Sequence, residues 1–282
     1  MYGVLIALLP AFVVSLIYFG LGALIVTLTS VVACLFFEWA IARFIMKHSG
    51  NSILDGSAAI TGVLLAFNLP SNLPVWIIVI GALFAIGVGK MSFGGLGNNP
   101  FNPALAGRVF LLLSFPVQMT TWPKVGQLSS YIDAETAATP LSIMKGVIKG
   151  APGYSLDQLP DSFNLFIGNN GGCIGEVSAA ALLIGLVYML MKKIITWHVP
   201  VSILVTVFVF SGIMYLVNPQ IYVSPVIQLI SGGLLLGAIF MATDYVTTPL
   251  TRRGKIIFGI GCGLITALIR LFGSMTEGVS FS

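Results

Sequence analysis

Charged residues are scarce in this sequence. Of its 282 residues, 13 are Lys or Arg and 9 are Asp or Glu, which is 8% of the chain, whereas a soluble globular domain has about 25%. Apolar residues make up 57%. This composition excludes an ordinary soluble enzyme and indicates an all-α polytopic membrane protein. With a net charge of only +4, the basic residues report orientation in a membrane and give no reason to expect a nucleic-acid partner.

Residues that bind metals are equally few. The three cysteines, Cys34, Cys173 and Cys262, form no CxxC pair, and the two histidines, His48 and His198, are far apart. An iron–sulfur cluster needs about four grouped thiolates, and a disulfide framework needs an even set of cysteines. We therefore expect no metal site in this chain. No Gly-rich dinucleotide fingerprint follows a strand either, so we expect no NAD site.

Long apolar runs are what the sequence has in abundance. We expect membrane segments at 3–19, 21–44, 54–69, 73–92, 103–119, 175–191, 198–217, 226–243 and 255–272. About 20 apolar residues cross the hydrocarbon core, and the runs 54–69 and 103–119 are shorter than that and bounded by Pro and Gly. Short interrupted segments are typical of broken helices that line a site near the membrane midplane.

The basic residues predict the orientation of these segments. With a cytoplasmic N-terminus, eight of them fall on the inside: Arg43, Lys47, Lys90, Lys192, Lys193, Arg252, Arg253 and Lys255. The three that fall outside, Lys124, Lys145 and Lys149, lie in one long loop, where the positive-inside rule is weak. We therefore expect the loop 120–174 on the extracytoplasmic face of the membrane.

Two segments of similar composition indicate an internal repeat. Residues 55–70 and 231–249 share a start of small residues, a Leu-rich middle and a terminal Pro, and they run in opposite directions under this orientation. Such a pair predicts an inverted repeat, with 1–119 as the first repeat and 175–282 as the second, in a single membrane domain 1–282. The alternative is that any two Gly- and Leu-rich helices look alike.

The segment 94–107, GGLGNNPFNPALAG, is the first candidate binding site. Gly95 allows a ligand to approach the backbone, and Asn98, Asn99 and Asn102 offer amide donors and acceptors. Pro103 is suited to begin a helix whose free N–H groups face this loop. The alternative is a plain turn between helices, in which three asparagines at membrane depth would need other partners.

A second candidate lies in the long loop, in the segment DAETAATPL. Pro140 disfavours helical backbone at Thr139, so this hydroxyl is expected to be exposed on a turn, with Thr136 close to it. From the residues alone, the simpler interpretation of Thr139 is an N-cap of the helix that follows.

Ionisable residues at membrane depth are costly and are therefore functional candidates. Asp55, Glu176 and Asp244 lie at the ends of predicted segments and are candidates for an ion path, although helix capping is the alternative for Asp55 and Asp244. For Glu38 the alternative is a pair with a nearby basic residue. We expect Arg108 to bind an anionic or carbonyl ligand such as a flavin ring.

Several motifs together resemble a known family. GGLGNNPFNPALAGRVF, SFPVQMTTW, DAETAATPL, GGCIGEVS and SGGLLLGAIFMATDYVTTPLTRRG, in this order, resemble the family that includes RnfD of the Rnf electron-transport complex and NqrB of the sodium-pumping NADH:quinone oxidoreductase. The resemblance extends over nearly the whole chain. It implies nine to ten transmembrane helices in two inverted five-helix repeats of urea-channel-like fold, with broken half-helices.

The resemblance also implies a function. In the family, the last threonine before Pro-Leu carries FMN through a phosphoester made by a flavin transferase from FAD, which corresponds here to Thr139. Ala134 and Ala137 stand where the family usually has glycines, and Thr136 is retained. The resemblance also implies a non-covalent riboflavin and partner subunits that carry flavins or iron–sulfur clusters. The implied activity is that of a ferredoxin:NAD⁺ oxidoreductase coupled to Na⁺ or H⁺ transport. The implied location is the lipid bilayer of a bacterial or archaeal cytoplasmic membrane.

Two further expectations complete this interpretation. Family members begin with a cytoplasmic lead and continue past the EGVSFS segment into one more helix, so both ends are expected to be clipped here. The alternative function is a urea-channel-like channel or transporter without a redox role, since inverted repeats with broken helices serve transport as well. A channel would have no use for a flavin on Thr139.

Overall fold

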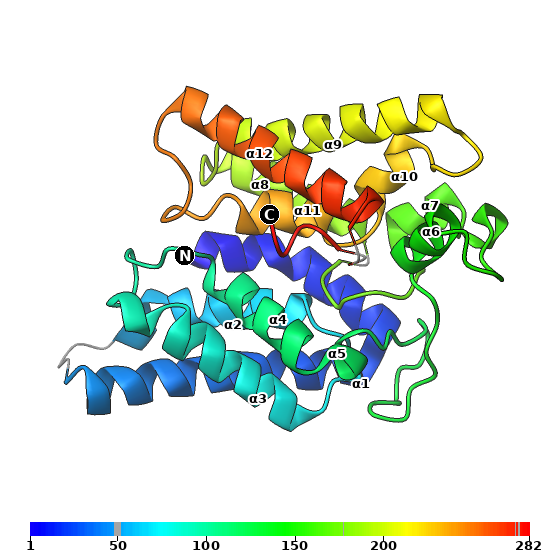
Figure 1. Ribbon diagram of the computed structural model, residues 1–282. Helices are drawn as coiled ribbons and strands as arrows, with labels where there is room; N and C mark the ends of the chain where they lie inside the picture. Colours follow the sequence, from blue (N-terminus) through cyan, green and yellow to red (C-terminus); the bar gives the residue numbers. More distant parts are fainter. Residues whose placement is uncertain (48–51, 177, 274, 276) are drawn as a thin grey trace.

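The computed structural model describes residues 1–47, 52–176, 178–273, 275 and 277–282, so His48 lies outside the described residues (Figure 1). Within these ranges the regular elements are all helical, which confirms the predicted all-α class. The α-helices are α1 (Tyr2–Ala40), α2 (Ser57–Phe67), α3 (Val75–Leu83), α4 (Pro103–Ser114), α5 (Pro116–Met119), α6 (Pro140–Ile148), α7 (Ser162–Ile167), α8 (Ala179–Met191), α9 (His198–Val217), α10 (Pro225–Ile230), α11 (Leu234–Leu236) and α12 (Arg252–Leu271).

Helix α1 is interrupted in its middle by Gly20. The backbone there has φ 53° and ψ −126°, and a Cβ at this position would lie 2.1 Å from the carbonyl oxygen of Leu128, so only glycine fits. The chain reverses its direction at this residue (Figure 1). The two predicted segments 3–19 and 21–44 are therefore the two arms of one broken helix.

The helices form two groups that pack on each other (Figure 1). In the first group α1 packs against α2 and α3, and in the second α9 packs against α12, while α8 joins the groups through α1. Helices α6 and α7 lie at one end of the molecule. The inverted repeat remains a prediction.

The lengths of the helices agree with a membrane protein that contains broken segments. Among the described residues, four helical stretches are long and apolar enough to cross a membrane: Tyr2–Ile45, Val75–Phe93, His198–Val217 and Arg252–Leu271. Helices α2, α4 and α8 are apolar but shorter, as predicted for α2 and α4. The run 226–243 was predicted to be one continuous segment. In the structure it breaks between α10 and α11, where Gly232 has φ 65°.

The outer surface is apolar where lipid or a partner subunit would cover it. Helices α1, α9 and α12 carry rows of exposed large hydrophobic side chains, among them Phe36, Phe208 and Ile257. Such exposure would be unfavourable in water but is expected in a bilayer. The interior instead contains a small number of buried polar side chains, and these define the candidate site.

Candidate functional site

Arg108 lies at the centre of a buried polar cluster between the two groups of helices. It is 4% exposed, and its guanidinium donates to Oε1 of Glu176 at 2.9 Å, to the carboxylate of Glu277 and to the side-chain oxygen of Asn68. Glu176 precedes α8, Glu277 follows α12 and Asn68 follows α2. The cluster therefore joins α4 to three other segments that are far apart in the sequence.

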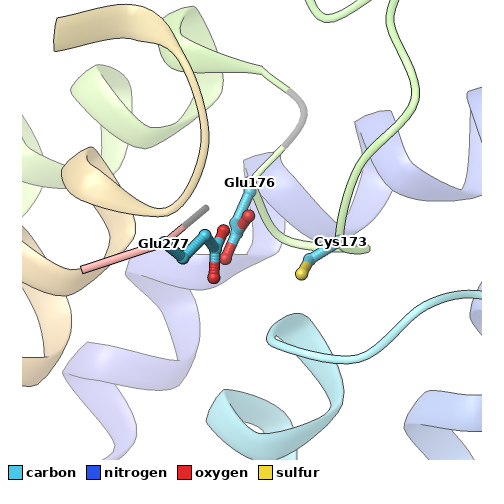
Figure 2. A group of neighbouring side chains, drawn as sticks. All are labelled: Cys173, Glu176 and Glu277. Atoms are coloured by element: carbon cyan, nitrogen blue, oxygen red, sulfur yellow. The ribbon is translucent and has the colours of Figure 1, made fainter. Parts of the chain in front are cut away.

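Three potential metal ligands belong to the same cluster. The sulfur of Cys173 and the carboxylates of Glu176 and Glu277 lie within 4.8 Å of one another, and Figure 2 shows the two carboxylates side by side with Cys173 facing them. Arg108 also donates to the Cys173 sulfur at 3.4 Å, so its guanidinium contacts all three groups. The arginine is thus the cation of this cluster, and the absence of a metal site stays a prediction.

A second arginine lies beside the two carboxyl groups. Arg270 is also buried and is close enough to act electrostatically on both Glu176 and Glu277. Two buried guanidinium groups therefore face two buried carboxyl groups, and among the described residues Arg108 is the one that hydrogen-bonds them.

Thr139 lies at the edge of this cluster. It is the N-cap of α6, with extended backbone (φ −78°, ψ 156°) imposed by Pro140, and its Oγ1 accepts the N–H of Ser142 at 3.2 Å. The structure therefore confirms that Thr139 is the N-cap of the helix that follows, as the sequence suggested. Thr139 also lines a cavity of about 20 Å³ together with Glu176 and Glu277.

The surroundings of Thr139 limit how a flavin could be attached. Thr139 is only 9% exposed, so the expectation of an exposed hydroxyl is wrong, whereas Thr136 is exposed on the loop that leads to it. The cavity of about 20 Å³ has room for about one water molecule and not for an isoalloxazine ring. The hydroxyl of Thr139, and not this cavity, is therefore the feature that suits a covalent flavin, because a hydroxyl can form a phosphoester.

The Asn-rich loop forms a different site. Asn99 is buried and donates to the carbonyl of Phe101 at 2.9 Å, and Asn102 caps α4 by accepting the N–H of Ala104 at 3.0 Å. Asn98 is exposed, while Gly95 is buried with φ 92°. Arg108 follows this loop in the sequence but hydrogen-bonds Asn68 and the buried glutamates, so it belongs to the other cluster.

Two cavities border this loop. One of about 110 Å³ is lined by Asn99, Asn102, Ser57, Lys90 and Asp244. Another of about 710 Å³ lies between the two groups of helices, is mostly apolar and is also lined by Asn102. The larger cavity has the volume expected of a small-molecule site, which is about 300–1,000 Å³.

Lys90 and Glu38 form a second buried ion pair. Their Nζ and Oε2 atoms are 2.6 Å apart, and the ammonium also donates to Oγ of Ser57 at 2.6 Å. Oδ1 of Asp55 in turn accepts from the N–H and the hydroxyl of Ser57 at 2.7 and 2.6 Å. The alternative of a paired Glu38 is thereby confirmed, and Asp55 has the helix-end role that was its alternative.

The structure thus divides the predicted residues between two places. Thr139, Arg108 and Glu176 surround one cluster, with Thr136 on the loop beside it. Asp55, Asp244, Asn99 and Asn102 lie with Lys90 around the other, where Asn99 hydrogen-bonds Asp244. Sequence reasoning did not identify the partners Asn68, Glu277 and Lys90. For Lys90, the available signal was a single charge within an apolar run. Glu277 follows the last apolar run, so the sequence offered no such signal for it.

Comparison with known proteins gives a match over the entire chain. The sequence model described as the NQR2, RnfD, RnfE family matches residues 1–282. The chain is 46% identical to the D subunit of the Na⁺-translocating ferredoxin:NAD⁺ oxidoreductase complex of Acetobacterium woodii, covering 100% of this chain and 83% of the relative. It is 41% identical to the D subunit of the proton-translocating ferredoxin:NAD⁺ oxidoreductase complex of Clostridium ljungdahlii, with 100% and 84% covered. A third relative, the D subunit of the ion-translocating oxidoreductase complex of Stutzerimonas stutzeri, is 38% identical, with 100% and 85% covered.

Proposed function

The chain belongs to the NQR2, RnfD, RnfE family, and from this premise we propose that it is the D-type membrane subunit of an ion-translocating ferredoxin:NAD⁺ oxidoreductase complex. The observation that carries the proposal is the match over the full length of the chain. Electrons enter and leave through partner subunits of the complex, because neither an iron–sulfur motif nor a dinucleotide fingerprint occurs in the sequence.

We propose that FMN attached to Thr139 by a phosphoester is the redox group of this chain. The attachment replaces the hydroxyl proton of Thr139 with the phosphorus of FMN and releases AMP from FAD, a reaction for a separate flavin transferase. The hydroxyl at the start of α6, the extended backbone before Pro140 and the neighbouring buried cluster support this choice over the exposed Thr136. The flavin supplies the electron-transfer chemistry, and this chain supplies its position and electrostatic surroundings.

A second, non-covalent flavin is proposed for the cavity of about 710 Å³. Phe84, Phe101 and Phe110 offer apolar and aromatic walls, and Asn102 offers a polar group at its edge. An isoalloxazine ring needs both, because its faces are apolar and its edges are hydrogen-bonding groups. Riboflavin fits these requirements without a phosphate, and no basic side chain lines this cavity among the described residues.

We propose that the electron flow is coupled to transport of Na⁺ or H⁺. Moving one charge against about 100 mV requires about 2.3 kcal/mol, and one electron falling through the same potential releases as much. Asp55 and Asp244 at one end and Glu176 at the other are the candidates for the ion path. One relative is named for Na⁺ and another for protons, so family membership is compatible with either ion.

The covalent flavin is tested in denaturing gels. When the chain is co-expressed with a flavin transferase, we expect a band that fluoresces under ultraviolet light, and mass spectrometry should find an FMN-sized adduct on the peptide 125–145. Thr139→Ala should abolish both signals, and the matched control Thr136→Ala should retain them. A chain without the adduct would refute the proposed cofactor and favour the channel alternative. An adduct on Thr136 would refute the choice of residue.

A further inference from the structure

Helix α6 carries a charged residue on its buried face. Leu141 and Met144 pack against Val223 in a small apolar cluster, and Lys145 follows on the same face, four residues after Leu141. Lys145 is 6% exposed, whereas Lys149 at the end of the helix is exposed. Burying an ammonium group is costly unless it is hydrogen-bonded, so Lys145 needs hydrogen-bond acceptors close to it.

The partners of Lys145 are main-chain groups at the end of another helix. Its Nζ donates to the carbonyl oxygens of Ile269 at 3.1 Å and of Arg270 at 2.9 Å, in the last turn of α12. The last carbonyls of a helix carry a partial negative charge, and a cation there is favourable. Lys145 therefore docks α6 onto the C-terminal end of α12.

The same end of α12 is connected to the wall of the cavity beside Thr139. The guanidinium of Arg270 donates to the carbonyls of Gln228 at 2.7 Å and Ser231 at 2.9 Å, where α10 ends. Gly232, the next residue, lines the cavity together with Thr139. At Gly233 a Cβ would lie 2.4 Å from Oε1 of Glu176, so this backbone directly abuts the buried carboxyl pair.

These connections form a continuous path from Thr139 to another part of the cavity lining. They run from Thr139 along α6 to Lys145, across to Arg270, and through Ser231 to Gly232 on the cavity wall. Since α6 is a single rigid helix of nine residues, fixing position 145 also fixes its first turn. Apolar contacts alone allow a helix to slide or rotate, whereas two hydrogen bonds to fixed carbonyls have directional requirements.

We propose that Lys145 is a positioning residue for the chemistry at Thr139. Its two hydrogen bonds hold the start of α6 against the cavity wall, and this sets where a flavin attached to Thr139 lies relative to Glu176 and Glu277. The inference rests on the proposed function of Thr139 and adds a residue that touches neither the hydroxyl nor the flavin.

The test compares three substitutions in the full chain, assembled in its complex and co-expressed with a flavin transferase. Lys145→Met keeps the length and the apolar contacts but removes the donors, Lys145→Arg keeps donors, and Lys149→Met is the matched surface control. Three quantities are measured: the fraction of chains with covalent flavin, the midpoint potential of that flavin, and hydrogen exchange of the amides in the first turn of α6.

Loss of hydrogen bonds from a charged donor shifts a docking equilibrium by about tenfold or more. For Lys145→Met we therefore expect about tenfold faster exchange in that turn, less covalent flavin, and an altered midpoint potential in the chains that carry it. Lys145→Arg should restore most of each quantity, and Lys149→Met should leave all three unchanged. If Lys145→Met fails to accumulate in the membrane, Lys145→Gln, which retains one donor group, replaces it.

Two outcomes distinguish a failure of the positioning role from a failure of the proposed function. If the unsubstituted chain carries covalent flavin and Lys145→Met has the same flavin fraction and potential, the positioning role is wrong while the proposed function stands. If the unsubstituted chain carries no flavin, the proposed function fails, and the role of Lys145 in flavin chemistry fails with it.

Discussion

The two buried ion-pair sites among the described residues differ in what they connect. Lys90 pairs with Glu38 inside the first group of helices, at 2.6 Å. Arg108 contacts both Glu176 and Glu277 between the two groups of helices, and Arg270 is buried beside them. The first site therefore stabilises packing within one group, whereas the second links the two groups.

Arg108→Met should have the largest effect on this comparison. It leaves two buried carboxyl groups without the cation that hydrogen-bonds them, and breaking a buried pair costs about 3–5 kcal/mol. We expect a large fall in the apparent melting temperature of the detergent-solubilised protein and little protein in the membrane. A melting temperature close to that of the unsubstituted protein would mean that the cluster contributes little to holding the helix groups together.

Lys90→Met should have a smaller effect because it removes the cation from only one carboxylate. We expect a loss near the lower end of about 3–5 kcal/mol, the usual cost when one partner of a buried ion pair is removed. Glu38→Gln in the same chain should recover much of it, because a neutral amide replaces the buried charge. The comparison between the pairs would be wrong if Lys90→Met destabilised the protein more than Arg108→Met.

Substitutions at the rim of the cluster should have the smallest effects on stability. Thr139→Ala removes an N-cap, which costs about 1 kcal/mol, and Thr136→Ala on the exposed loop should stay within about 0.5 kcal/mol. Thr139→Ser keeps the hydroxyl and the cap but removes the β-methyl that restricts χ1, so we expect partial flavin attachment with almost unchanged melting. Full attachment in Thr139→Ser would show that the methyl group is unimportant.

Much of the fold could be predicted from the sequence because apolar runs and breakers act locally. The short helices α2 and α4 lie where short, Gly- and Pro-bounded runs occur, and α4 begins at Pro103 as expected. The break between α10 and α11 was not predicted, since a single Gly232 with positive φ interrupts an otherwise continuous apolar run.

The site was less predictable because its contacts join distant parts of the chain. The sequence indicated Arg108 as a cation for an anionic or carbonyl ligand, whereas in the structure it hydrogen-bonds Glu277, which is 169 positions away and lies outside every apolar run. Asn68 and Lys90 could not be recognised as partners either, since neither forms a motif with the residue it contacts. The motifs indicated candidate residues, and packing determines which of them meet.

The break at Gly20 has a mechanical consequence. The N–H of Leu21 donates to the carbonyl of Leu128 at 2.9 Å, and the N–H of Gly126 donates to the carbonyl of Tyr18 at the same distance, so the long loop is attached to α1 on both sides of its break. Beyond Thr139, the chain is tied to α12 of the second group by α6. The stretch between these two attachments therefore connects the two groups of helices. Any sliding of one group over the other has to stretch or relax this stretch of chain, and Thr139 lies at its end.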